Sequence, residues 1–319
     1  MFNFLTLKEE VFALNLSDSF LKIAKLKKKS RGFVLTSLNE TEIPKGIIEE
    51  GIIKDEEFLS KIIKSSIKSV KGKKIKTKYV VASLPEEKSF LQIIQMPKMN
   101  EKELSLAVPL QAENYIPLPI DEVYLDFQVI PPVKNYFDNI EVLVIAMSKK
   151  IIDSYVSCFK KAGLLPIIFE TESEAIARAL IQKDKNGSLE VLINIDKNSA
   201  KLIVFSGNFV RFTCSIPISL NEKTKTELTK QIDKYINFYC DHSSYEYLLP
   251  SAKISKILLC GRGSELKGLT EFMTKKLNIP VELSDPLINF ASKKSKLLKD
   301  KNVLSFATAI GLAMREDDI

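Results

Sequence analysis

Two short stretches of the chain repeat the same order of residue types. Residues 13–23 read ALNLSDSFLKI and residues 192–202 read LINIDKNSAKL. Each has an apolar strand pattern, an asparagine, a polar turn and a second apolar stretch. A magnesium site at the end of the first strand would require a carboxylate, because Mg²⁺ prefers charged oxygen ligands beside its retained waters. Both copies instead carry an amide there, at Asn15 and Asn194.

The other reactive residue types exclude several kinds of chemistry. The only histidine is His242, and the four cysteines have no C-x-x-C pair and no neighbouring histidine; they are Cys158, Cys214, Cys240 and Cys260. We interpret the cysteines as buried reduced thiols, and we predict no metal site. Zinc chemistry and a Ser-His-Asp triad both need more imidazole than this chain contains.

The charge is positive and concentrated in lysine runs. The chain has 47 basic and 40 acidic residues, a net charge of +7, with runs at 25–31, 71–78 and 293–301. We interpret these runs as solvated loops or hairpin tips; weak attraction to anionic lipid or nucleic acid is the alternative. The aromatic residues are too scattered to form base-stacking platforms, so we predict no nucleic-acid partner.

Length and hydropathy limit the architecture. A chain of 319 residues is longer than a domain with a single small core usually is, so we expect two lobes. No apolar run reaches the roughly 18 residues of a spanning helix, and the N-terminus lacks the pattern of a signal peptide. We therefore expect a cytoplasmic location.

The elements that position the first asparagine read as an α/β lobe. Apolar patterns predict strands at 11–17, 20–27 and 32–40, followed by a helix that Asp55 caps and a buried strand at 78–84. This order of strand meander, helix and strand is typical of an α/β lobe.

A module of strand, helix, two strands and helix follows at 85–165. Asn100 and Glu103 form a capping box that fixes the start of its first helix. Pro109 lies inside that helix and should kink it, because proline removes a backbone donor.

The second asparagine lies in a second meander. We predict strands at 189–195, 199–206 and 209–217, with a two-residue turn at Gly207 and Asn208. The remaining predicted elements are a strand followed by a helix at 166–180, a helix at 222–247, a strand at 253–260, a turn at 261–264, a helix at 265–277, a strand at 279–283 and a C-terminal helix at 303–315.

Several ordered motifs resemble those of the PilM family, actin-like proteins of type IV pilus assembly related to the cell-division protein FtsA. They read IPKGIIEEGIIKD, MPKMNEKEL, AENYIPLPIDEVYLDFQV, AGLLPIIFETESEAIARA, CGRGSELKGLTEFMTKKLNIPVELSDP and ATAIGLAMR, and the resemblance covers nearly the whole chain. It implies an α/β, actin-like (ribonuclease H-like) two-lobed fold.

The resemblance also implies a division of the chain. The first lobe would be 1–84 together with 165–185 and the C-terminal helix 303–315. An inserted, partner-binding module would occupy 85–164. The second lobe, 186–302, would lack the helical segment that walls the nucleotide cleft in relatives, because the sequence runs almost directly from strand to long helix.

In actin-like folds the two meander turns grip a nucleotide from opposite lobes. Matched residue by residue, the nucleotide-binding positions are Asn15, Ser17, Ser19, Lys22, Asn194, Asp196, Gly261 and Gly263. Ser17 and Asp196 replace the family's turn glycines, and Asn15 and Asn194 replace its aspartates. At roughly 4 Å a carboxylate at position 196 would repel a phosphate by about 4 kcal/mol at an effective dielectric near 20. Gly261 and Gly263 equally suit a positive-φ turn before a helix.

These departures predict that ATP with Mg²⁺ is bound weakly or not at all. We assign no catalytic residue and expect a pseudo-ATPase. The alternatives are an active actin-like or sugar-kinase-like phosphotransferase, and an FtsA-like membrane-tethered filament protein. The last would need an amphipathic C-terminal helix, whereas the chain ends in AMREDDI.

With catalysis not expected, the function that the resemblance implies is the binding of a partner protein. PilM-like proteins bind the N-terminal peptide of a PilN-like inner-membrane protein beside the inserted module. The matching residues here are Glu113, Tyr115, Ile116, Pro117, Leu118 and Pro119. Alternatively, Ile116 and Leu118 fill the module's core and the prolines end a helix. We predict a cytoplasmic scaffold that contacts other pilus platform proteins and reaches the inner face of the membrane through its partners.

Overall fold

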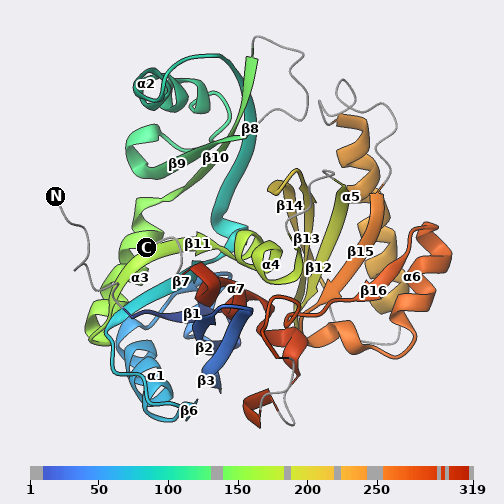
Figure 1. Cartoon of the computed structure of the whole chain (residues 1–319). Helices are drawn as coiled ribbons and strands as arrows, with labels where there is room; N and C mark the ends of the chain where they lie inside the picture. The colour runs from blue at the N-terminus through green and yellow to red at the C-terminus, as the bar shows by residue number, and fades with distance from the viewer. Residues whose placement is uncertain are drawn as a thin grey trace. The chain divides into compact units, whose positions relative to one another are not determined.

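The computed structural model describes residues 10–130, 139–182, 188–218, 224–242, 254–292, 296–298 and 302–315. The chain forms two compact units, each described here by itself (Figure 1). Unit 1 comprises Met1–Pro85, Ile151–Leu180 and Pro286–Ile319, and unit 2 comprises Glu86–Lys150 and Ile181–Asp285. None of the described helices is long and apolar enough to cross a membrane.

Unit 1 is built on a six-stranded sheet in the order β11-β7-β1-β2-β3-β6. Its strands are β1 (Phe12–Leu16), β2 (Phe20–Lys29), β3 (Gly32–Glu42), β6 (Lys71–Gly72), β7 (Tyr79–Leu84) and β11 (Leu165–Thr171). Strand β1 is antiparallel to β2 and parallel to β7. A separate small hairpin consists of β4 (Ile48–Glu49) and β5 (Ile52–Ile53).

The helices of unit 1 are α1 (Glu56–Lys68), α3 (Lys149–Lys161), α4 (Glu172–Leu180) and α7 (Ala307–Met314). The predicted cap of α1 is confirmed, because the Asp55 carboxylate accepts the backbone N–H of Phe58 at 2.9 Å. Every residue of α7 is buried. A Cβ added at Gly311 would collide with the backbone of Ala175, so glycine permits the close packing of α7 on α4.

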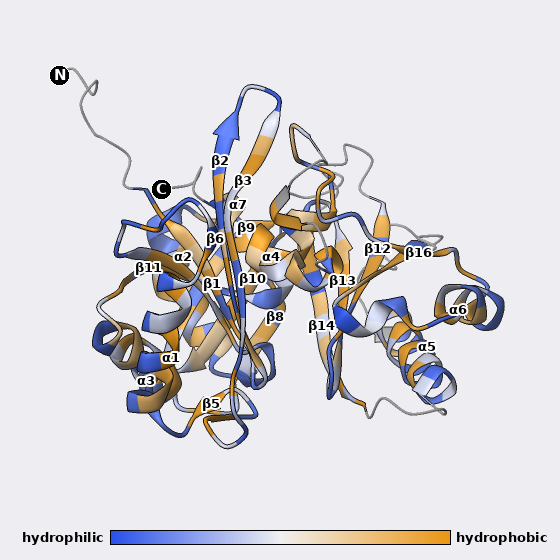
Figure 2. Cartoon of the chain, turned by 90° about the horizontal axis from the view of Figure 1, so that it is seen from below, coloured by the Kyte–Doolittle hydropathy of each residue, from blue (hydrophilic) through white to orange (hydrophobic). Residues whose placement is uncertain are grey.

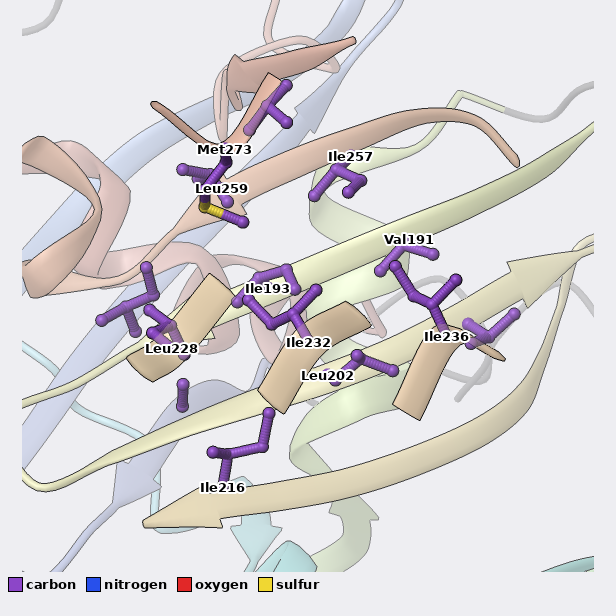
Figure 3. Close-up of a cluster of buried hydrophobic side chains, with 14 of the residues drawn as sticks. Val191, Ile193, Leu202, Ile216, Leu228, Ile232, Ile236, Ile257, Leu259 and Met273 are labelled. Atoms are coloured by element: carbon purple, nitrogen blue, oxygen red, sulfur yellow. The ribbon is translucent and has the colours of Figure 1, made fainter. Parts of the chain in front are cut away.

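Unit 2 repeats the topology in a five-stranded sheet ordered β14-β13-β12-β15-β16. Its strands are β12 (Leu189–Ile195), β13 (Ser199–Ser206), β14 (Phe209–Pro217), β15 (Ile254–Cys260) and β16 (Val281–Leu283), and its helices are α5 (Thr224–His242) and α6 (Leu269–Leu277). As in unit 1, the first meander strand is antiparallel to the second and parallel to a later strand. Apolar side chains of α5, among them Leu228, Ile232 and Ile236, pack on this sheet (Figure 3).

Unit 2 also contains a three-stranded sheet ordered β8-β10-β9, with β10 in the middle. Its strands are β8 (Ser89–Pro97), β9 (Val123–Ile130) and β10 (Asn139–Ser148), and its helix is α2 (Glu101–Ala112). The predicted capping box is present: Asn100 and Glu103 exchange hydrogen bonds of 2.9 and 3.0 Å. One face of α2, including Leu104 and Val108, packs into the core of this module.

Most predicted elements agree with the structure, and the three strands of the second meander match residue for residue. The helix predicted from 265 begins instead at Leu269, because Arg262–Glu265 form a 3₁₀ turn and Gly268 has φ +71°. The predicted C-terminal helix starts as a 3₁₀ segment, Val303–Phe306. The predicted ends of the 222–247 helix lie outside the described residues, as does much of the 293–301 lysine run.

The compact units do not follow the predicted boundary at 164. Residues 151–164 lie in unit 1, where α3 contacts α1: the hydroxyls of Ser154 and Ser157 donate to the Glu56 carboxylate at 3.1 and 2.7 Å. The three-stranded module lies instead in unit 2. The three-part division into lobe, insertion and second lobe stays a prediction.

The first lysine run lies where the sequence placed it, at a hairpin tip. Lys27, Lys28 and Lys29 end β2 and are exposed, and this end of β2 is strongly hydrophilic in Figure 2. The lysine side chains at the tip of the hairpin are therefore exposed to solvent.

Candidate functional site

The two asparagines occupy equivalent places in the two units. Asn15 faces Lys22 across β1 and β2, and Asn194 faces Lys201 across β12 and β13. In both pairs the asparagine is the second-to-last residue of the first meander strand. The repeat seen in the sequence is therefore a repeat in backbone register.

The turns after the two strands are closed in the same way. The backbone N–H of Ser17 donates to Phe20 O at 2.9 Å, and that of Asp196 donates to Ser199 O at 2.8 Å. Neither turn contains a residue with positive φ. The absence of glycine at these two positions therefore causes no backbone strain.

The carbonyl that ends each turn is also used in the same way. Ser19 O accepts the backbone N–H of Ile43 at 2.9 Å, and Asn198 O accepts that of Ile218 at 3.0 Å. The backbone of Ser19 thus fixes the chain that leaves the meander in unit 1.

In unit 1, the side chain of Asn15 is a buried hydrogen-bond donor. Its Nδ2 donates to Ser83 Oγ and to Glu172 Oε1, both at 2.9 Å. Asn15 and Glu172 are each only 4 % exposed. Because Ser83 lies on β7 and Glu172 begins α4, the amide joins a strand to the start of a helix. Both protons of the amide are used within the unit.

Sequence reasoning missed Glu172 as a neighbour of the candidate site. The available signal was the run ETE at 170–172, where a predicted strand passes into a predicted helix. A carboxylate at the start of a helix is favoured by the helix dipole. The sequence did not indicate that this carboxylate meets Asn15.

Asp18, in the first turn, was also missed. Its carboxylate accepts the backbone N–H groups of Glu50 and Gly51 at 2.8 and 2.9 Å. These two residues have φ of +48° and +74° and form the β4–β5 turn. The hydroxyl of Tyr155 donates to Gly51 O at 2.9 Å. The carboxylate therefore stabilises a turn of its own unit.

Lys22 is likewise occupied within unit 1. Its Nζ donates to Ser305 O at 2.7 Å and lies 5.8 and 6.0 Å from the ring centres of Phe20 and Phe306. The side chain is buried. Lys22 thus connects β2 to the segment before α7, and its predicted contact with a nucleotide stays a prediction.

In unit 2, Asn194 contacts the end of the neighbouring strand. The thiol of Cys260 lies 3.6 Å from Asn194 Oδ1, to which it can donate. Gly261 has φ +86°, and a Cβ there would collide with Asn194 and with the backbone of Ile195. The structural explanation for Gly261 is therefore confirmed.

Gly263 is required for a different reason from the one predicted. It has no positive φ; instead, a Cβ there would lie 2.5 Å from Ile195 Cγ2. Close approach of the turn to β12 therefore explains this glycine.

Asp196 adds negative charge to the second turn. Its Oδ1 accepts the backbone N–H of Lys197 at 2.9 Å, so the carboxylate is used partly within its own turn. It remains partly exposed. After the meander, β14 ends at Pro217, and the described part of α5 is Thr224–His242. The predicted direct connection falls largely outside the described residues and stays a prediction.

The segment predicted to bind a peptide divides into buried and exposed residues. Ile116 is 8 % exposed and belongs to the core of the three-stranded module, against which Leu118 also packs. Core packing, the predicted alternative, is therefore confirmed for Ile116. Glu113, Tyr115, Pro117 and Pro119 are exposed.

A family model described as "Type IV pilus assembly protein PilM" matches residues 13–214 and 219–317. This chain belongs to the PilM family. Several solved structures resemble this PilM-family protein, among them the following two. One is a chain of a "PilM-PilN type IV pilus biogenesis complex", 23 % identical, with a TM-score of 0.81 over 97 % of this chain and 99 % of that one. The other is the ethanolamine utilization protein EutJ from Carboxydothermus hydrogenoformans, 10 % identical, with a TM-score of 0.53 over 95 % and 88 % of the two chains.

The repeated meander topology and the structural likeness confirm the predicted actin-like, two-lobed α/β fold of this PilM-family chain. The predicted nucleotide and peptide contacts are a separate matter and stay predictions.

The cysteines of the PilM-family chain are free thiols. Cys158 and Cys260 are buried, and Cys214 and Cys240 are partly buried. Burial, together with the nearby Glu56 carboxylate, raises the pKa of the Cys158 thiol to about 12. Because the thiolate is the reactive form, Cys158 is unreactive at neutral pH.

Proposed function

We propose that this chain is a cytoplasmic scaffold of type IV pilus assembly that binds the N-terminal peptide of a PilN-like inner-membrane protein without ATP turnover. Membership of the PilM family supports the assembly process. The solved relative occurs in a PilM-PilN complex, which supports the kind of partner. Contacts with other platform proteins would then hold the chain at the inner face of the membrane.

The main support for the proposed absence of ATP turnover is that Asn15 serves as a hydrogen-bond donor inside unit 1. Its amide brings no charge, and its Nδ2 donates to Ser83 and Glu172. In unit 2, Asn194 brings no charge either, and Asp196 adds a negative charge at a turn that would have to receive a phosphate. These donor sets do not fit a magnesium-bound triphosphate, and we derive no catalytic step through one.

The exposed part of the 113–119 segment supports peptide recognition. Tyr115 is 52 % exposed, and Pro117 and Pro119 limit the flexibility of the chain beside it. The three-stranded sheet in the same unit has β8 and β9 as its outer strands. An extended peptide can hydrogen-bond to such an outer strand while its alternate side chains enter apolar pockets.

The proposal is tested by titrating a fluorescent N-terminal peptide of the PilN-like protein into the full chain, with and without Mg·ATP. We expect saturable binding with the same Kd in both conditions. Absence of binding in both would refute the scaffold, and binding only with Mg·ATP would refute its independence of nucleotide.

Tyr115→Ala should weaken peptide binding by about tenfold, as expected when an exposed aromatic anchor of an interface is truncated. Phe58→Ala is the matched control, because Phe58 is an exposed aromatic residue, 44 % exposed, on α1 of the other unit. The titration of the fluorescent peptide, followed by its anisotropy, measures the Kd of both variants. Equal affinities for the two variants would remove Tyr115 from the peptide site.

A further inference from the structure

Helix α2 is apolar on two opposite faces. Leu104, Val108 and Ala112 are buried in the core of the module. Leu106 and Leu110, on the other side of the helix, are 75 % and 71 % exposed, the highest values among the large exposed hydrophobic side chains of the described residues. Residues four apart on a helix are neighbours on its surface. The two leucines therefore form one apolar patch.

The borders of this patch are acidic. Glu103 lies one turn before Leu106, Glu113 lies one turn after Leu110, and both are exposed. Glu113 also lies at the C-terminal end of α2, where the helix dipole is negative and the last turn has no basic residue. Lys102, one turn before Leu106 and next to Glu103, is the only basic residue of the helix, so the end of the patch at Leu110 is the more acidic one. The patch therefore favours a cation beside Leu110.

The charge of the whole module points in the same direction. Residues 89–148 contain eight acidic and three basic residues, a net charge of −5, within a chain whose net charge is +7. An apolar patch on an acidic surface selects a partner that is both apolar and basic.

We propose that the outer face of α2, defined by Leu106 and Leu110, binds an amphipathic helix of a partner protein whose apolar stripe is bordered by lysine or arginine. The stripe would cover the two leucines, and its cations would approach Glu103 and Glu113. This face shares Glu113 with the 113–119 segment assigned to the PilN-like peptide, but Leu106 and Leu110 lie outside that segment, and the inference does not depend on that assignment.

Charge argues against two other occupants. A membrane with anionic lipids would repel the acidic module. A symmetric contact with α2 of a second copy would place the acidic ends of the two surfaces close together. Both occupants can be detected in the test.

The probe is a synthetic helix of about 18 residues, roughly five turns, with a leucine stripe bordered by lysines. A matched peptide carries glutamate in place of each lysine. Binding to the full chain is followed by fluorescence anisotropy. We expect the lysine peptide to bind at least about tenfold more tightly than the glutamate peptide. Its affinity should fall as the salt concentration rises, because salt screens the charges.

The decisive variant is the double substitution Leu106→Gln and Leu110→Gln, which keeps good helix formers on an exposed face. We expect this variant to bind the lysine peptide at least about tenfold more weakly than the unchanged chain, while its Tm stays the same. Leu283→Gln is the matched control, since Leu283 is 47 % exposed on β16; it should bind as the unchanged chain does.

Three results would overturn the inference. The first is equal binding of the lysine peptide to the double variant and to the control. The second is self-association in sedimentation velocity that only the double variant loses, because the occupant would then be a second copy. The third is binding of anionic vesicles that only the double variant loses, which would make the occupant a membrane.

Discussion

Replacing Glu170 with alanine is expected to lower the free energy of unfolding by about 3–5 kcal/mol. Glu170 is only 7 % exposed and accepts hydrogen bonds from two arginines. Arg178 binds both of its carboxylate oxygens, and Arg315 Nη1 lies 2.9 Å from Oε1. Arg178 Nη1 also donates to Gly311 O at 3.1 Å. Without the carboxylate, two partly buried guanidinium groups lose the negative charge that compensates them.

The measurement is urea unfolding followed by circular dichroism, because the chain has no tryptophan. Glu10→Ala is the comparison, since the exposed Glu10 pairs with Lys25 at 2.6 Å. This more solvated pair should contribute about 1 kcal/mol or less. If both variants lost the same stability, the arginine pair around Glu170 would not be a major stabilising contact of unit 1.

Asn15→Asp is expected to lower the free energy of unfolding by about 3 kcal/mol at pH 7.5, although the two side chains have the same shape. The new carboxylate would stand where the Asn15 amide now lies 2.9 Å from Glu172 Oε1, and both residues are buried. Two carboxylates at that distance repel each other, and one of them holds a proton more tightly in the folded than in the unfolded state.

The sign of the pH dependence follows from this extra proton. The loss of stability is absent below the unfolded pKa of about 4, grows as pH rises, and is complete above the raised folded pKa. The variant should therefore recover stability relative to the unchanged chain as the pH falls from 7.5 to 5. Urea unfolding at several pH values measures this recovery.

Asn194→Asp is the matched control for this experiment. Asn194 holds the same register position in unit 2, but its side chain contacts the thiol of Cys260 rather than the carboxylate found beside Asn15. We expect a loss of about 1 kcal/mol or less and little pH dependence. Equal pH profiles for the two variants would show that Glu172 does not determine the cost at position 15.

The meanders could be predicted from the sequence because their signals are local. Alternating apolar residues, a polar turn at 17–19 and the Gly207-Asn208 turn set the strand ends and their pairing. The structure confirmed the strands and turns that the two quoted stretches had indicated. The start of α6 was placed wrongly, because Gly268 interrupts a helical pattern that reads as continuous.

The partners of the candidate site residues could not be predicted in the same way. Asn15 meets Ser83 and Glu172 across 68 and 157 residues of chain, and a local pattern carries no information about such contacts. Likewise, periodicity alone does not tell which apolar residues of α2 face the core. Leu104 and Leu106 look alike in the sequence, but only Leu104 is buried.

The claim that the two asparagines leave this PilM-family chain unable to hold a magnesium-bound nucleotide is tested most directly by calorimetric titration of Mg·ATP into the full chain. We expect no saturable heat up to about 1 mM nucleotide, which corresponds to a binding free energy weaker than about −4 kcal/mol. A saturable, magnesium-dependent isotherm with a Kd of about 1 μM would contradict it.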